Sequence, residues 1–238
     1  ISIIYLISLA GLFLFKTEQE KIIFQYTQEQ YNHEIKSILK LDLDPLKQLV
    51  YNYTYWNDFV LNMNKYDKAW FKENIDAFIT DNHVDYVCVY DTLYNSIHEV
   101  SSDSIFSRGF IPKKAILQLN KNRFSDYFIS TREGLIEISS ASIHPSNDSA
   151  HILSKPSGYL VLGKYWNPGH LDELSILSSS KIKISKISDA IIVKGQYTNS
   201  FSQILSGWDR KPLVRLDFYR ENHAFELYKN ISISMLLI

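Results

Sequence analysis

With 238 residues, of which 45% are hydrophobic and 14% aromatic, the chain can bury a substantial core, which excludes wholesale disorder. A formal net charge of -1, without any basic cluster, argues against nucleic acid or anionic lipid as a partner held by charge. Cys88 is the only cysteine in the sequence, which excludes an internal disulfide and a cysteine-based zinc site.

Apolar, uncharged segments stand at both ends of the sequence. Residues 1–15 carry no charge and stop at Lys16, and residues 231–238 are again uncharged. Each segment is shorter than the ~20 residues that a helix needs to cross a bilayer, but a sequence cut inside two membrane helices has this pattern. The alternative for residues 1–15 is the core of a signal peptide, although no small-residue cleavage site follows. We predict the end of a first transmembrane helix at 1–15, an extracytoplasmic domain at 16–230 and the start of a second transmembrane helix at 231–238.

The first part of the soluble stretch has helical periodicity. No Pro or Gly occurs in residues 17–41, and apolar residues recur there at helical spacing, which predicts one long amphipathic helix. Asp44 followed by Pro45 predicts the restart of a second helix, because Asp can cap free N–H groups and Pro suits the first helical position. Asp67 is expected to cap a third helix.

From His83 onward the period changes from helical to extended. Short apolar runs bounded by turn residues predict strands at 85–90, 96–100, 127–131, 135–143, 159–166, 181–186, 190–194 and 212–219. Helices are predicted from Pro112 to Leu119, after Asn167 and Pro168, and from about Glu221 to the end. Helices followed by an antiparallel sheet with helical insertions predict a single α+β domain.

The sequence holds no recognisable catalytic or metal-binding motif. A Gly-rich phosphate loop, HExxH and GxSxG are all missing, and no two of the seven histidines stand at the spacing of helical metal ligands. We therefore expect no catalytic residue, no metal ion and no cofactor in this segment.

The richest candidate for a binding site is the aromatic and polar run of residues 51–58. Aromatic rings there provide apolar area, and amide and carboxylate groups can orient a polar or cationic ligand. The alternative is that the aromatic residues belong to the core and that Asp58 bonds a backbone amide or an arginine. The candidate ligand-binding residues on these grounds are Tyr53, Trp56, Asn57, Asp58, Trp70, Tyr86 and Tyr90.

An ordered series of short pieces resembles the fourth CHASE-type family of extracellular sensor domains. The pieces are Asn52-x-x-x-Trp56-Asn57-Asp58-Phe59-Val60, Trp70-x-x-x-Asn74-Ile75, Val84-Asp85-Tyr86-Val87 and Pro156-x-Gly158-Tyr159-Leu160-Val161-Leu162-Gly163-Lys164. Together they span roughly residues 41–219. The resemblance implies an extracytoplasmic sensor with a PAS-like, Cache-type sheet and a long N-terminal helix. Asn52 and Asn57 depart from the family, which usually has Asp at both positions. The resemblance also implies a basic residue after Gly163, and Lys164 fits this, so Lys164 joins the candidate ligand-binding residues.

These features together predict a ligand-sensing, non-enzymatic domain of a membrane receptor of the histidine kinase or diguanylate cyclase type. We expect it to be bound to the membrane through both termini, to dimerise through the long helix, and to take an unidentified small molecule as its ligand. One alternative is a structural module that dimerises a receptor and binds no small molecule. Another is a membrane-anchored hydrolase, which would need a nucleophile–base pair or a metal cluster.

Overall fold

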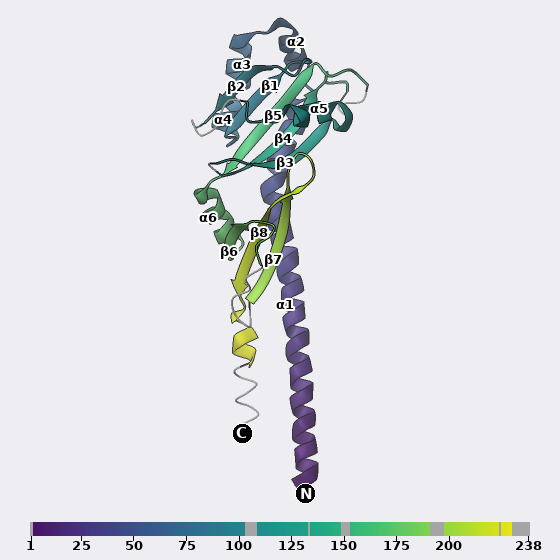
Figure 1. Cartoon of the computed structure of the whole chain (residues 1–238), viewed down its shortest axis with the longest axis vertical. Helices are drawn as coiled ribbons and strands as arrows, with labels where there is room; N and C mark the ends of the chain where they lie inside the picture. The colour runs from purple at the N-terminus through teal and green to yellow at the C-terminus, as the bar shows by residue number, and fades with distance from the viewer. Residues whose placement is uncertain are drawn as a thin grey trace. The chain divides into compact units, whose positions relative to one another are not determined.

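A computed structural model describes residues 2–102, 109–132, 134–148, 153–190, 198–223 and 225–229. The chain divides into two compact units (Figure 1). Unit 1 comprises Ile1–Leu39, Glu173–Gln203 and Arg215–Ile238, and unit 2 comprises Lys40–Asp172 and Ile204–Val214. Four elements contribute residues to both units: α1 (Ser2–Tyr53), α6 (Pro168–Leu177), β7 (Thr198–Ser206) and β8 (Pro212–Glu221).

A five-stranded antiparallel sheet forms the centre of unit 2. Its strands lie in the order β2-β1-β5-β4-β3. Their bounds are β1 (Tyr86–Tyr90), β2 (Ser96–Ser101), β3 (Phe124–Ser130), β4 (Leu135–Ile143) and β5 (Gly158–Trp166). Every residue of β1 and β4 is buried. A strand is buried at every residue only when both faces of its sheet are covered.

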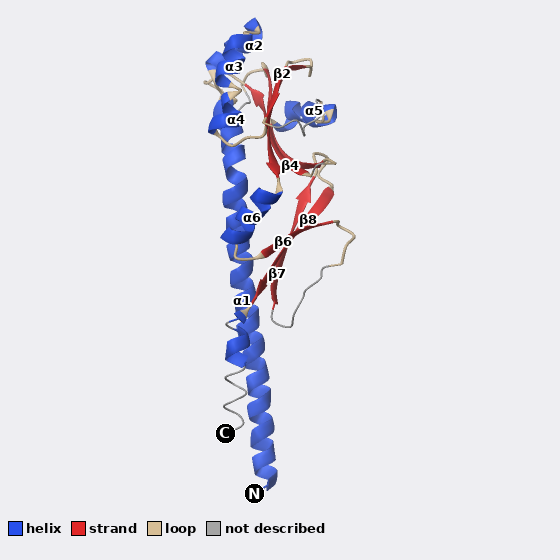
Figure 2. Ribbon diagram, turned by 90° about the vertical axis from the view of Figure 1, so that its left-hand side faces the viewer, coloured by secondary structure: helices blue, strands red, loops and turns tan. Residues whose placement is uncertain are grey.

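Different helices cover the two faces of this sheet (Figure 2). The C-terminal part of α1 lies on one face with α2 (Asn57–Lys65), α3 (Lys68–Asn74) and α4 (Ala77–Asp81), and we call this the helix face. α5 (Lys113–Asn122) lies on the other, which we call the α5 face. Successive strand residues point to opposite faces, so each strand supplies side chains to both.

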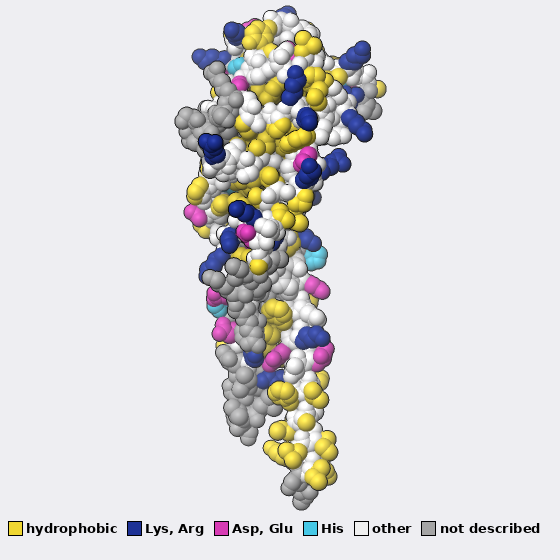
Figure 3. Space-filling view, viewed as in Figure 1, with side chains coloured by type: hydrophobic (Ala, Val, Ile, Leu, Met, Phe, Trp, Pro, Cys, Tyr) yellow, Lys and Arg dark blue, Asp and Glu magenta, His cyan; other side chains and the backbone are white. Residues whose placement is uncertain are grey.

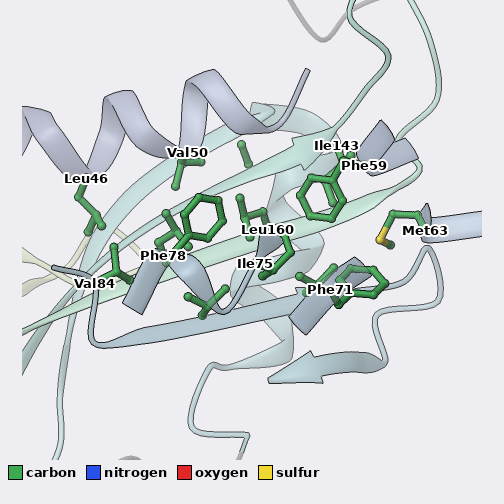
Figure 4. Packing of buried hydrophobic residues seen from close by; sticks show 14 residues of the cluster. Leu46, Val50, Phe59, Met63, Phe71, Ile75, Phe78, Val84, Ile143 and Leu160 are labelled. Carbon is green, nitrogen blue, oxygen red and sulfur yellow. The ribbon is translucent and has the colours of Figure 1, made fainter. Parts of the chain in front are cut away.

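Two apolar clusters fill the space on either side of the sheet. On the helix face, Leu46 and Val50 of α1 and Phe78 of α4 pack against β1 and β5 (Figure 4). On the α5 face, Ile116 and Leu119 of α5 pack against the alternate residues of the same strands. The sheet therefore separates two apolar cores.

The predicted restart of a helix at Pro45 is wrong, because α1 runs without interruption from Ser2 to Tyr53. Pro45 has no N–H group to donate to the carbonyl of Leu41, which normally weakens or breaks a helix. Leu41 is 74% exposed, where water can bond this carbonyl, while Leu46 and Val50 are buried on the sheet. Burial of the following turns thus outweighs the missing hydrogen bond. The predicted cap is confirmed at Asp67, whose carboxylate accepts from the N–H groups of Ala69 and Trp70.

In unit 1, a three-stranded sheet has the order β6-β8-β7, with β6 at Lys181–Ser185. The sequence did not predict β7. Polar residues occupy both buried and exposed positions of this strand, so its sequence shows no alternation of apolar and polar residues. Of the strand predicted at 190–194, only Ala190 is described, and it lies outside any strand. The final helix is observed at residues 223 and 225–229, and the apolar segment 231–238 lies outside the described residues.

The N-terminal part of α1 exposes its apolar side chains, including Ile3, Leu6 and Phe13 (Figure 3). Within the described part of the chain, no helix combines the length and the apolar character that crossing a bilayer requires. The predicted α+β class with a long N-terminal helix is confirmed.

Candidate ligand-binding site

The sheet of unit 2 separates the predicted site residues. Tyr53, Trp56 and Trp70 pack against the core of the helix face, whereas Tyr86 and Tyr90 lie in the core of the α5 face. Because a continuous sheet stands between the two groups, these residues do not line one common pocket in this structure.

The three aromatic residues on the helix face contact other rings, edge to face for Tyr53 on Phe78 and tilted for Trp56 on Trp70. The ring of Tyr53 lies 4.7 Å from that of Phe78, and Trp56 lies 5.2 Å from Trp70. All three are only partly buried, and each contacts apolar residues of the same cluster. This arrangement fits the alternative in which they are core residues.

The two polar residues of the predicted site are exposed at the start of α2. Asn57 accepts a hydrogen bond on Oδ1 from the N–H of Ser146, at 2.9 Å. It therefore ties the loop after β4 to α2. Asp58 lies in the first turn of α2, where a carboxylate is stabilised by the free N–H groups of the helix end.

On the α5 face, polar side chains are gathered inside an otherwise apolar core. Tyr86 donates from Oη to Oε1 of Glu99 at 2.8 Å, and the same carboxylate oxygen accepts from the N–H of Gly109 at 3.3 Å. Tyr159 bonds Asn120 of α5. Burial raises the pKa of both Tyr86 and Tyr90, so their hydroxyl groups stay protonated. We call the four buried tyrosines of this face, Tyr86, Tyr90, Tyr127 and Tyr159, the hydroxyl cluster.

Tyr127 of β3 is the member of the hydroxyl cluster that lacks a partner. Its side chain is 3% exposed, and its hydroxyl makes no hydrogen bond within the described part of the chain. Burial raises the pKa of Tyr127, and the nearby Ser140 hydroxyl opposes this shift without reaching hydrogen-bond geometry. An unbonded buried hydroxyl costs about 1–3 kcal/mol, so such a group needs an explanation.

The predicted site residues include Tyr86 and Tyr90 of this cluster but not Tyr127 or Tyr159. A signal for Tyr159 existed, because it begins the strongest predicted strand, and the observed register places it directly opposite Tyr90. No comparable signal marks Tyr127, because its environment depends on α5 and on the pairing of β3 with β4.

Lys164 lies on the helix face and binds α1. Its Nζ is 3.2 Å from Oδ1 of Asp42, and Nε2 of His170 is 3.1 Å from the other carboxylate oxygen. Burial alone raises the pKa of Asp42, but the bonds from His170 and Lys164 more than offset it, so the pKa lies below its usual value. Lys164 thus acts here as a tie between β5 and α1.

The only serine–histidine–aspartate chain that we find among the described residues is deeply buried. Nε2 of His144 lies 2.9 Å from Oγ of Ser142, and Nδ1 lies 3.2 Å from Oδ2 of Asp148. This order of groups resembles a hydrolytic triad. All three residues are at most 1% exposed, however, and Asp148 also accepts hydrogen bonds from the backbone of Leu153 and Ser154. The network therefore fixes the loop after β4.

A cavity of about 900 Å³ lies in unit 1, at the end of α6 and along β6 and β8. Its lining combines Ile176 and Ile182 with the charged side chains of Lys181, Lys183 and Arg220. Arg220 is already bound to Glu34 of α1 through two hydrogen bonds. None of the predicted ligand-binding residues lines this cavity.

Comparison with solved structures shows the fold. Two crystal structures of the periplasmic domain of Vibrio cholerae LuxQ each match with a TM-score of 0.55 and 13% sequence identity. They cover 82% and 83% of this chain, and 100% and 99% of the LuxQ chains. The ligand-binding domain of the Campylobacter jejuni chemoreceptor Tlp3, in complex with L-valine, matches with a TM-score of 0.46 and 8% sequence identity, and this match covers 87% of this chain and 97% of the Tlp3 chain.

A search of the curated proteins finds no match. The family model of the CHASE4 domain matches residues 38–185, which is more than half of the chain. This match confirms the resemblance seen in the sequence, and the chain belongs to the CHASE4 family of sensor domains.

Proposed function

We propose that this chain is the extracytoplasmic ligand-sensing part of a transmembrane receptor, of the histidine kinase or diguanylate cyclase type, and is not itself an enzyme. Membership of the CHASE4 family supports a sensor role, and the LuxQ domains with the same fold are periplasmic. In this proposal residues 16–230 lie outside the cytoplasm, and residues 1–15 and 231–238 enter the membrane. The exposed apolar side chains at the N-terminal end of α1 support such an anchor, because water would solvate them poorly.

The ligand site that we propose is the hydroxyl cluster on the α5 face, and the unbonded hydroxyl of Tyr127 carries the proposal. A small polar molecule that bonds this hydroxyl would remove the penalty of burying it alone. The Ser140 hydroxyl on the neighbouring strand and the other tyrosine hydroxyls of the same face offer both donors and acceptors. The ligand therefore belongs to the class of small molecules with several hydrogen-bonding groups.

Signalling would follow from a shift of population between two arrangements of α5 and the sheet. A ligand changes this balance only if it binds the two arrangements with different affinity. α1 has residues in both units and is therefore the element through which such a change would pass. Ile22 and Tyr26, one turn apart, are 49% and 60% exposed on α1 and would form part of a homodimer contact.

A thermal-shift screen of amines, amino acids, carboxylates and sugars tests the ligand proposal on the 238-residue chain in detergent. A ligand at one hundred times its Kd stabilises the chain by about 2.7 kcal/mol. We expect Tyr127→Phe to lose this stabilisation, while the control Tyr51→Phe, at an exposed position, keeps it. The site proposal fails if an identified ligand stabilises the wild type and Tyr127→Phe equally.

A receptor module without a small-molecule ligand is the second candidate. It is favoured by Tyr53, Trp56 and Trp70, which pack against the core of the helix face. If no compound stabilises the chain and Tyr127→Phe leaves signalling by the whole receptor intact, this second candidate replaces the first.

A further inference from the structure

Glu137 of β4 is a carboxyl group buried on the helix face, beneath α1. Its side chain belongs to a residue only 4% exposed, and Oε2 accepts one hydrogen bond from Nε1 of Trp166, at 3.2 Å. No described cationic side chain lies within ion-pair distance of it. A charged carboxylate in such a place has lost most of its hydration without gaining a compensating partner.

The charged groups that face Glu137 already have other partners. They are Asp42 and Lys47 of α1 and Lys164 of β5, and their partners include Asp126 of β3 and His170 at the start of α6. Lys164 stands directly opposite Glu137 in the ladder of β4 and β5, but its ammonium group lies against Asp42. Lys47 similarly pairs with Asp126, at 3.7 Å.

Two carboxylates on different elements are thus within reach of one lysine. Asp42 belongs to α1, whereas Glu137 belongs to the sheet. Lys164, also on the sheet, forms its ion pair with Asp42 and so binds α1. Burial raises the pKa of Glu137 to about 8, the Trp166 hydrogen bond opposes this shift, and the nearby Asp42 carboxylate adds to it. The group therefore changes charge near pH 8.

We propose that Glu137 is a proton-binding group that sets how firmly α1 is held on the sheet, and that the chain responds to alkaline pH through it. While Glu137 is protonated, Asp42 keeps both Lys164 and His170, and α1 is tied down. When Glu137 releases its proton to solvent, its carboxylate competes with Asp42 for Lys164, and the tie weakens. This response is independent of the ligand proposed for the α5 face, since the two sites lie on opposite faces of the sheet.

The indole of Trp166 reports directly on Glu137. In the ¹⁵N-labelled 238-residue chain in detergent, we expect the Trp166 Nε1–H resonance, assigned with Trp166→Phe, to shift with a midpoint near pH 8. In Glu137→Gln, which keeps the shape and an acceptor oxygen, the resonance should stay constant. The exposed Glu73→Gln is the matched control and should titrate as the wild type does.

Hydrogen exchange tests whether the proton is coupled to α1. After correction for the chemical exchange rate, we expect amides in residues 43–50 to exchange about tenfold faster at pH 9 than at pH 6.5 in the wild type. Glu137→Gln should abolish this rise, and Lys164→Met should make exchange fast at both pH values, because Asp42 has then lost its bond to the sheet. An unchanging Trp166 resonance between pH 6 and 9, or a shift without faster exchange in α1, overturns the proposal.

Discussion

The guanidinium group of Arg220 lies 4.7 Å from the centre of the Tyr31 ring, so β8 holds α1 within unit 1 by a cation–π contact. The same guanidinium makes two hydrogen bonds to the carboxylate of Glu34, at 2.8 and 2.6 Å. It also donates to the carbonyls of Ser178 and Ser179 after α6. One side chain thus joins three segments of unit 1.

Arg220→Lys is expected to destabilise the chain by about 1–2 kcal/mol, because an ammonium group keeps the charge but cannot bond Glu34 and both carbonyls together. Urea unfolding of the variant measures this loss. Glu34→Gln is the matched control and should lose at most about 1 kcal/mol, since the Glu34 side chain is 45% exposed. Equal losses in the two variants would mean that the ion pair alone accounts for the role of Arg220.

Gly158 at the start of β5 has no room for a side chain. A Cβ atom there would meet the Met63 methyl group and would lie 2.6 Å from the carbonyl oxygen of Tyr90. The methionine can move, but the backbone of β1 cannot, so Gly158→Ala should cost about 1–3 kcal/mol in denaturant unfolding. Gly11→Ala in α1 has open space around it and should cause no loss. Full rescue of Gly158→Ala by Met63→Ala would contradict the role given to Tyr90.

The sequence predicts much of the fold, because short apolar runs such as Tyr86–Tyr90 and Gly158–Trp166 indicate buried strands. It failed at Pro45, where tertiary packing of Leu46 and Val50 overrides a local helix breaker. It also failed at β7, whose Thr, Asn, Ser and Gln residues show no apolar alternation. Local patterns predict elements well where the local and tertiary preferences agree.

Tyr127→Phe is expected to raise the stability of the ligand-free chain by about 1 kcal/mol, because it removes a buried hydroxyl that makes no hydrogen bond. Urea unfolding of both proteins without added ligand measures the difference. Tyr86→Phe is the contrasting variant and should destabilise, since it leaves Glu99 without the hydroxyl donor. A loss of stability in Tyr127→Phe would show that this hydroxyl has a partner in solution, such as an ordered water.

Acid pH is expected to weaken the loop held by His144. Burial lowers the pKa of His144, Asp148 opposes the shift, and Arg123 adds to it, so the folded state binds this proton less readily than the unfolded state. The contribution to stability is therefore complete above the unfolded value of 6.5 and is lost as the pH falls through the lower folded value. The contribution of His144 is measured by comparing the unfolding free energies of the wild type and of His144→Gln at pH 7 and at pH 5. An equal pH response in the two proteins would assign it to other groups.

The candidate site was predictable only in part. Residue type pointed to Tyr86 and Tyr90, but it could not tell that Trp56 and Trp70 face the opposite side of the sheet. The face of the sheet on which a side chain lies depends on the strand register and on which helix covers each face. A short motif contains neither piece of information. Lys164 shows the same limit, because its partner Asp42 is 122 residues away in the sequence.

Pro45 lowers the bending stiffness of α1 at one point, although the helix is continuous. It stands six residues beyond Leu39, where the helix passes from unit 1 to unit 2. A missing backbone hydrogen bond lowers the bending stiffness of a helix at that point. Asp42, with its bonds to Lys164 and His170, lies within this same turn, between Leu41 and Pro45. α1 therefore has its point of lowest stiffness and its bonds to β5 and α6 in one turn, so that bending there would strain those bonds.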